Sequence, residues 1–194
     1  MHRLAADQGH AQAQCHLGVT CRNGAGVPQD YAEAAWLFRL AADQGARDAQ
    51  CNLGVMYENG VGVPQDHAEA ARFCRRSSDQ GFAPAQRILG DMYQNCTGVQ
   101  QDYTEAVRLC RVAADQGYAQ AQRKLGVMYK DDTGVSQDYI EAAWLHRLAA
   151  DPQAQCNLAL MYTKGTGVPQ DYTEAVRWCR LAADQGHLQA QCKG

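Results

Sequence analysis

The segment Ala49-Gln50-Cys51-Asn52-Leu53-Gly54-Val55-Met56-Tyr57 decides the fold, because variants of it recur along almost the whole chain. Its Ala-Gln pair returns at Ala13/Gln14, Ala49/Gln50, Ala85/Gln86, Ala121/Gln122, Ala154/Gln155 and Ala190/Gln191. The steps between these pairs are 36, 36, 36, 33 and 36 residues. Self-similarity at such a period is the signature of stacked repeats, so the sequence predicts a solenoid rather than a domain around one core.

Two further landmarks keep the same phase. The pattern Gly-Val-x-Gln-Asp begins at Gly26, Gly62, Gly98, Gly134 and Gly167. The pattern Ala-Ala-Asp-Gln-Gly, with variants, begins at Ala5, Ala41, Ser77, Ala113, Ala149 and Ala182. We therefore treat residues 1–194 as a single solenoid, with repeats over approximately 11–46, 47–82, 83–118, 119–151 and 152–187 and partial repeats over 1–10 and 188–194.

The first half of a repeat is expected to be an amphipathic helix. Ala49, Leu53 and Tyr57 recur at helical spacing and share one apolar face. Gly54 lies at the edge of that face, where the missing side chain would let a neighbouring helix approach closely. Gly60 is suited to the left-handed residue that ends many helices. A turn and a second helix should follow.

The second helix has a clear predicted start. Asp66 is the expected N-cap, and Glu69 completes a capping-box-like pair. The same spacing occurs at Asp30/Glu33, Asp66/Glu69, Asp102/Glu105, Asp138/Glu141 and Asp171/Glu174. We interpret these acids as caps rather than paired catalytic carboxylates, because they also complement the helix dipole. The expected buried stripe consists of Ala70, Phe73, Cys74 and Ser77.

Three places break the pattern. Pro152 follows Asp151 in a stretch three residues shorter than its equivalent in the preceding repeat, which predicts a tightened junction and an altered superhelical rotation between the fourth and fifth repeats. Cys96 and Asp132 stand where the hairpin turn elsewhere has glycine. Asp tolerates the left-handed conformation better than Cys, so strain is expected at Cys96.

The succession Ala-x-x-x-Leu-Gly-x-x-Tyr, Gly-x-Gly-Val, Asp-x-x-x-Ala and Ala-Ala-x-x-Gly resembles the Sel1-like repeat, a relative of the tetratricopeptide repeat. The resemblance covers five full units. It implies an all-α fold, a right-handed α/α superhelical solenoid of helix–turn–helix repeats. It also implies a role as a scaffold or adaptor that binds a protein or peptide partner on the concave face lined by the first helices, since a fold alone does not fix a function.

Composition and motif spacing argue against several other classes of function. The net charge of −3 gives no basic footprint for nucleic acid. No stretch approaches the roughly 20 apolar residues that span a bilayer, and the first residues lack the apolar segment of a signal peptide, which favours a cytoplasmic location. We expect a monomer, and no enzyme: no His lies at a diagnostic spacing from a Ser or Cys nucleophile, so no catalytic or cofactor-binding residue is assigned.

Nine cysteines raise the question of metal or disulfide chemistry. No Cys-x-x-Cys occurs and no Cys/His set has zinc-finger spacing, so no metal site is expected. Cys51/Cys74 and Cys156/Cys179 would lie at similar heights in their hairpins, but Cys51 points away from the apolar face, so reduced thiols are favoured. Some cysteine-rich relatives are linked to cell-wall or β-lactam ligands, which leaves a ligand-binding protein with weak hydrolase activity as the alternative function.

The resemblance places the first helices on the concave surface, and residues off their apolar face should line it. These residues are Asn52, Val55, Arg87, Asp91, Arg123, Lys124, Val127, Asn157 and Leu160, with Cys15 and Cys51 beside them. Arg87, Arg123 and Lys124 form a basic trio that could receive an acidic side chain or a C-terminal carboxylate of an extended peptide. The alternative is a solvated charged face that Asp91 and Asp131 largely neutralise.

Overall fold

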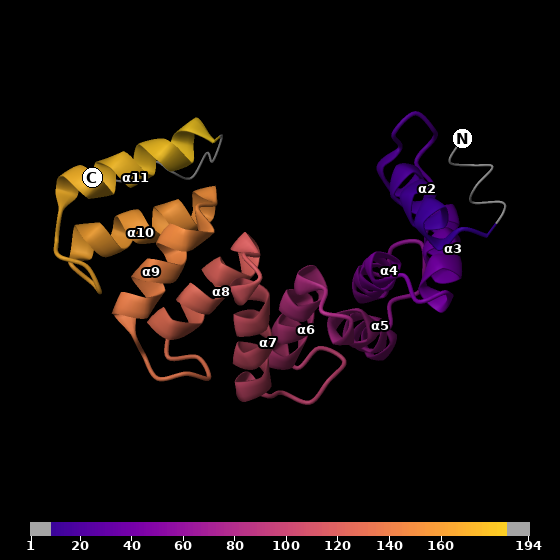
Figure 1. Ribbon diagram of the computed structural model, residues 1–194, viewed down its shortest axis with the longest axis horizontal. Helices are drawn as coiled ribbons and strands as arrows, with labels where there is room; N and C mark the ends of the chain where they lie inside the picture. The colour runs from indigo at the N-terminus through magenta and orange to yellow at the C-terminus, as the bar shows by residue number, and fades with distance from the viewer. Residues whose placement is uncertain (1–8, 186–194) are drawn as a thin grey trace. The chain divides into compact units, whose positions relative to one another are not determined.

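The computed structural model describes residues 9–185, and within that range the chain is all-α, as predicted, with ten helices and no strand. The helices form two compact units, one ending at Asp102 and the other beginning at Tyr103 (Figure 1). The first unit contains α2 (Ala11–Asn23), α3 (Tyr31–Asp43), α4 (Arg47–Asn59), α5 (His67–Asp79) and α6 (Ala83–Asn95). The second contains α7 (Tyr103–Asp115), α8 (Ala119–Lys130), α9 (Tyr139–Ala149), α10 (Pro152–Lys164) and α11 (Tyr172–Asp184).

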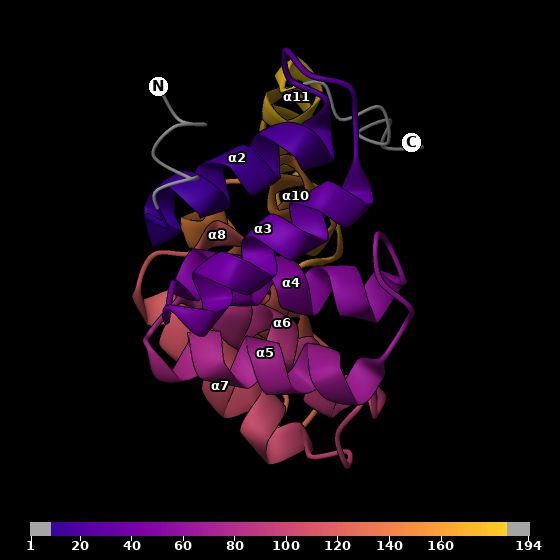
Figure 2. The same ribbon diagram turned by 90° about the vertical axis from the view of Figure 1, so that its right-hand side faces the viewer.

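Each even-numbered helix is the first helix of a repeat, and each odd-numbered helix is the second. The pairs α2–α3, α4–α5, α8–α9 and α10–α11 are closely packed hairpins, and α3–α4 and α5–α6 join successive repeats in the first unit. Figure 2 shows α2, α3, α4 and α5 lying one beside the next. A stack of nearest-neighbour contacts of this kind is what defines a solenoid.

The predicted apolar face of the first helix is confirmed. Ala49 and Leu53 are fully buried, and Met56 and Tyr57 are nearly so. The Tyr57 ring stacks on Phe73 of α5, with 5.8 Å between centroids and 6° between the ring planes. The core of this repeat therefore lies between its own two helices.

The glutamine of the Ala-Gln landmark is a buried polar residue that bonds to two other segments. Gln50 donates from Nε2 to the Ala42 carbonyl of the preceding repeat at 3.2 Å. Its Oε1 accepts from Gln80 Nε2, at the end of the second helix of the same repeat, at 2.8 Å. Because a buried amide must be hydrogen-bonded, this position recurs as Gln although its neighbours are apolar.

The predicted Asp N-caps are confirmed, but the predicted capping-box role of Glu69 is not. Asp66 Oδ1 accepts from the backbone N–H groups of Ala68 and Glu69, each at 3.0 Å. Asp138 and Asp171 cap their helices in the same way, and Asp30 accepts from Glu33 N alone. The reciprocal bond of a capping box is absent from this described turn, because the Asp66 N–H donates to the Tyr57 carbonyl and the Glu69 carboxylate bonds to Arg72 instead.

The hairpin turns depend on left-handed residues. Gly60 has φ 65°, and Cys96 and Asp132 adopt the same left-handed conformation at φ 58° and 56°. The strain expected at Cys96 stays a prediction. Gly62 is required for a second reason. A Cβ there would lie 2.1 Å from the Tyr31 carbonyl oxygen, so this turn packs directly on the start of the preceding repeat's second helix.

The shortened junction is also confirmed. Helix α9 has 11 residues where α3 has 13, and only Ala150 and Asp151 connect it to α10. Ala150 is left-handed at φ 51°. Asp151 then caps α10 by accepting from Ala154 N at 2.9 Å, and Pro152 takes the first helical position, which suits a residue without an N–H.

Candidate binding surfaces

The residues predicted to line the concave face divide between the two units. Asn52 and Val55 lie on α4, and Arg87 and Asp91 on α6, in the first unit. The second unit carries the rest: Arg123, Lys124 and Val127 on α8, and Asn157 and Leu160 on α10. All of them are at least partly exposed, and Leu160 is 51% exposed.

In the first unit the polar members of this set bond to neighbouring groups of the chain. Arg87 forms an ion pair with Asp91 one turn later on α6. Asn52 accepts from Arg22 Nη1 of α2 at 2.6 Å and donates to the Asp48 carbonyl at 2.9 Å. These bonds hold α2 to α4 and fix the Arg87 side chain, so a partner would have to compete with them.

In the second unit Arg123 also faces a carboxylate. Its Nε lies 3.5 Å from Asp151 Oδ2, at the shortened junction. Two cations of the predicted basic trio thus already have acidic neighbours, Asp91 for Arg87 and Asp151 for Arg123. Asp131 instead pairs with Lys130, at 3.3 Å, and not with the trio.

A groove between α8 and α10 combines residues that the sequence placed on the concave face with residues that it did not single out. We call it the α8–α10 groove; it has a volume of about 480 Å³ and is lined by Lys130, Asp131, Gln137, Tyr139, Asn157, Leu160, Met161, Lys164 and Thr166. It brings the predicted residues Asn157 and Leu160 together with two lysines, Lys130 and Lys164. Within residues 9–185, Lys164 has no ion-pair partner. The groove therefore combines an exposed apolar side chain with positive charge.

The cysteines mostly lie inside the fold. Cys15 and Cys51, expected beside the groove, are 3% and 6% exposed, so that expectation is wrong. Burial raises the pKa of the Cys15 thiol to about 11 and that of Cys51 to about 12. Both thiols are therefore protonated at neutral pH, whereas a cysteine nucleophile needs the thiolate.

The two disulfide candidates are not formed. Cys51 and Cys74 are free thiols, and so is Cys156. Cys179 is disulfide-bonded, so the expectation of reduced thiols is wrong for this residue. Among the described residues, no group of three or more His, Cys, Asp or Glu side chains is placed to hold a metal ion. In the same part of the chain, no helix is both long and apolar enough to cross a membrane.

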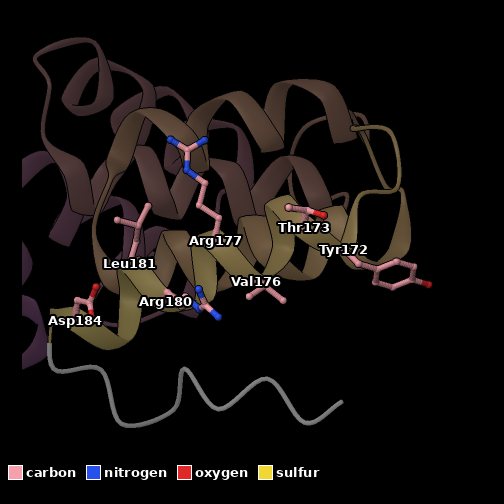
Figure 3. Close-up of a pocket in the computed structure, with 7 residues that line it drawn as sticks. All are labelled: Tyr172, Thr173, Val176, Arg177, Arg180, Leu181 and Asp184. Carbon is pink, nitrogen blue, oxygen red and sulfur yellow. The ribbon is translucent and has the colours of Figure 1, made fainter.

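The outer side of α11 forms another hollow, of about 600 Å³ (Figure 3). Its described lining residues lie on this one helix, among them Tyr172, Val176 and Arg180. Val176 is 50% exposed, whereas Val107, at the same position in α7, is 7% exposed. Among the described residues this hollow is thus formed by the outer face of one helix.

Helix pairs stacked in this way define the chain as an α-solenoid of helix–turn–helix repeats. Sel1 repeats match residues 11–45, 47–82, 83–118, 119–151 and 152–187, and the chain belongs to the Sel1 repeat family. Proteins of this family are generally scaffolds for protein interaction and typically not catalysts. No curated protein matches the chain.

Similar solved structures include Sel1 repeat proteins. A protective antigen of uropathogenic Escherichia coli, c5321, is 40% identical with a TM-score of 0.86; the match covers 95% of this chain and 40% of the antigen. A Sel1 repeat protein from Oxalobacter formigenes is 32% identical with a TM-score of 0.86, over 94% of this chain and 74% of that one. The immunity protein PA5088 of Pseudomonas aeruginosa shares the fold, at 22% identity and a TM-score of 0.69, over 98% and 73%.

Proposed function

We propose that the chain binds a protein partner in the α8–α10 groove, and that the partner supplies an extended segment with an acidic group beside an apolar side chain. The observation that carries this proposal is the position of Leu160, half-exposed in a groove with Lys130 and Lys164. Exposed leucine gives an apolar contact, and an ammonium group with no carboxylate partner favours an incoming anion.

Each side of the groove has a distinct role in this proposal. Lys164 provides the stronger anion contact, because Lys130 shares its charge with Asp131 at 3.3 Å. Asn157 offers an amide that can both donate and accept, which suits the backbone of an extended segment. Val127 precedes Lys130 by three positions on α8, so a longer segment could run along this helix toward Arg123 and Lys124.

Peptide selection followed by affinity measurement tests the proposal. A random peptide library displayed on phage would be selected on the full chain, and the enriched peptides measured by fluorescence anisotropy. Selected peptides should contain Asp, Glu or a free C-terminus next to an apolar residue. Lys164→Gln and Leu160→Asp should each weaken binding at least tenfold. Arg72→Gln removes one exposed charge from a second helix and is the matched control, with affinity expected within twofold.

Two results would contradict the proposal: enriched peptides without an acidic group, or affinities that Leu160→Asp leaves unchanged. The basic trio is tested separately with Arg87→Glu/Arg123→Glu. We expect this double variant to weaken binding further for peptides long enough to reach α8. If every selected peptide bound the double variant with unchanged affinity, the basic trio would not belong to the binding surface. The assignment of binding to the α8–α10 groove would not be affected by that result.

A further inference from the structure

Helix α11 exposes a face that the other second helices bury. Val176 is 50% exposed, whereas Val107, at the same position in α7, is 7% exposed. Ala183, near the end of α11, is exposed, whereas Ala42, at the same position in α3, is fully buried. Figure 3 shows Val176 in the hollow along this helix. We call the following residues, which share one side of the helix, the α11 face: Tyr172, Val176, Arg180 and Ala183.

The inner repeats show what covers this face. In the first unit α3 packs against α4, and α5 against α6. In the second unit α7 packs against α8, and α9 against α10. The covering helix is in every case the first helix of the following repeat. The α11 face is therefore one side of an interface that the chain itself forms repeatedly.

Two hydrogen bonds fix the register of this interface at α3. The Ala42 carbonyl, near the end of α3, accepts from Gln50 Nε2 of α4 at 3.2 Å. Arg39, one turn earlier on α3, donates to the hydroxyl of Tyr57. Since the later residue of α4 meets the earlier residue of α3, the covering helix runs antiparallel to the helix that it covers.

A third contact lies at the start of the covered helix. A side chain at Gly62, in the turn after α4, would overlap the Tyr31 carbonyl group. Gln50, Tyr57 and Gly62 thus form one pattern, Gln-x6-Tyr-x4-Gly, whose members meet a single helix in succession. The same spacing recurs in the three following repeats, at Gln86/Tyr93/Gly98, Gln122/Tyr129/Gly134 and Gln155/Tyr162/Gly167.

Helix α11 presents the groups that this pattern meets, in the same order. Ala183, Arg180 and Tyr172 occupy the positions from which α3 contributes its carbonyl, its guanidinium and its first-turn backbone. Within residues 9–185, Arg180 has no hydrogen-bond or ion-pair partner. Its equivalents in α3, α5, α7 and α9 all donate to a tyrosine hydroxyl of the next repeat. The α11 face therefore offers a guanidinium donor that suits a tyrosine.

A second copy of the chain is a poor occupant. Its helices α4, α6, α8 and α10 already pack against a second helix of their own chain. Helix α2 carries Gln14, and Gly26 follows it, but Cys21 stands where the pattern requires Tyr. Because a thiol is a weak acceptor, α2 would not supply the bond that Arg180 is placed to make. A first helix with the tyrosine supplies all three contacts.

We propose that the α11 face docks a helix and turn of another protein, which carries the pattern Gln-x6-Tyr-x4-Gly as the first helix of a repeat of the same kind. The chain would thereby join a second repeat protein end to end. None of the residues of the α11 face lines the α8–α10 groove, and the proposal does not depend on the function proposed for that groove.

A synthetic peptide that copies residues 46–63, with Cys51→Ser to prevent cross-linking, tests the proposal by fluorescence anisotropy on the full chain. We expect it to bind, and a peptide of scrambled order not to bind. In the peptide, Gly62→Ala should weaken binding at least tenfold, because the new side chain would overlap the backbone of the covered helix. Tyr57→Phe should weaken it about fivefold, because it removes one hydrogen bond.

A double-mutant cycle identifies the face that the peptide occupies. In an Arg180→Met chain the peptide change Tyr57→Phe should no longer weaken binding, because the hydroxyl has lost its donor. Arg39→Met is the matched control: Arg39 makes the same bond inside the chain, so its removal should leave the fivefold effect in place. Loss of the effect with Arg39→Met would mean that the peptide replaces α4, and would overturn the proposal.

A charge placed on the α11 face supplies a second test. Val176→Glu should weaken the peptide at least tenfold, because Val176 lies in the middle of the face. Leu148→Glu is the matched control, since Leu148 is 47% exposed on another second helix, α9. It should leave affinity within twofold, as should Leu160→Asp in the α8–α10 groove. Circular dichroism of each variant measures whether its helix content matches the wild type.

Other outcomes would also overturn the proposal. Failure of the peptide to bind the full chain would show that the α11 face is not open to a partner, and undiminished binding by Val176→Glu would place the peptide elsewhere. A Tyr57→Phe effect that persists in Arg180→Met would contradict the register. A loss with Leu160→Asp would place the peptide in the groove. In sedimentation velocity, a dimer that Val176→Glu abolishes would identify a second copy as the occupant.

Discussion

Arg75 of α5 donates a hydrogen bond from Nη2 to the hydroxyl of Tyr93 in α6, at 2.7 Å, and so joins one repeat to the next. Its guanidinium also lies over the Tyr93 ring, 5.9 Å from the centroid. The same bond recurs between Arg39 and Tyr57, Arg111 and Tyr129, and Arg147 and Tyr162. This pair therefore belongs to the interface between successive repeats, where a solenoid gains most of its cooperativity.

Tyr93→Phe should lower the free energy of unfolding by about 1 kcal/mol, because it removes the hydroxyl and keeps the ring under the guanidinium. Urea unfolding followed by circular dichroism measures the change. Tyr31→Phe is the control: its side chain is 40% exposed and makes no hydrogen bond, so its stability should match the wild type. A Tyr93→Phe protein as stable as the control would show that the bond contributes nothing across this interface.

Gly54→Ala should destabilise the chain although Ala is the better helix former by about 1 kcal/mol. A Cβ at position 54 would lie 2.6 Å from Cys74 Sγ and 3.1 Å from the Ala70 carbonyl oxygen. Overpacking of this kind costs about 1–3 kcal/mol, and the fixed backbone of Ala70 allows little relaxation. Thermal unfolding should therefore show a lower melting temperature for the variant.

Removing the Cys74 sulfur should relieve that clash. The double variant Gly54→Ala/Cys74→Ala is expected to regain stability relative to Gly54→Ala alone, because the new methyl group fills the space of the lost sulfur. The fifth repeat already has Ala159 at the position of Gly54, so the fold itself tolerates alanine there. Equal stability of the single and double variants would mean that the Ala70 carbonyl, not Cys74, limits the approach.

The local features of this chain could be predicted because one segment determines each of them. The apolar spacing of Ala49, Leu53 and Tyr57 is enough to identify a helix and its buried face. Asp66 caps the helix that begins at the next residue, so the signal and its structural result lie within four positions. The left-handed turn at Cys96 follows from its equivalence with Gly60.

The candidate binding surface was harder to predict because it depends on several helices at once. A helical wheel of α4 places Cys51 away from the apolar face, yet Cys51 is 6% exposed. Helix α4 packs against α3 of the preceding repeat as well as against α5 of its own, which a wheel of one helix does not describe. The α8–α10 groove combines Lys130 and Lys164 from different repeats. The junction between these two repeats is shortened at Ala150, which a uniform repeat period does not describe.

Cys96→Gly should stabilise the chain by about 0.5–1 kcal/mol. Cys96 ends α6 with φ 58°, a conformation that costs a residue with a side chain more than it costs glycine, and Gly60 and Gly165 take the same place in α4 and α10. Cys96→Ala keeps a Cβ and removes the thiol, so it should remain as stable as the wild type. Urea unfolding of both variants separates backbone strain from any effect of the sulfur.

His146 is the one imidazole among the described residues that is both fully buried and without a hydrogen-bond partner on either ring nitrogen. It lies where α3 has Phe38, with its ring against Gly126 of α8. Burial, and to a lesser extent the nearby Lys130 and Arg123, lowers the pKa of His146 from 6.5 to about 4, while Asp131 acts in the opposite direction. The folded state therefore holds this side chain neutral over a range in which the unfolded state protonates it.

The sign of the pH dependence follows from that difference. Above pH 6.5 both states are neutral at His146, and between pH 6.5 and 4 only the unfolded state binds the proton, so stability falls as the pH is lowered. The full effect is about 3 kcal/mol at 1.36 kcal/mol per pKa unit. Urea unfolding gives the free energy of unfolding at pH 7.5 and at pH 4.5. The difference between these two values should be about 2 kcal/mol smaller in His146→Phe than in the wild type. Phe38 packs against Gly18 in the same way, so phenylalanine should fit. An unchanged difference between the two pH values would assign the acid sensitivity to other groups.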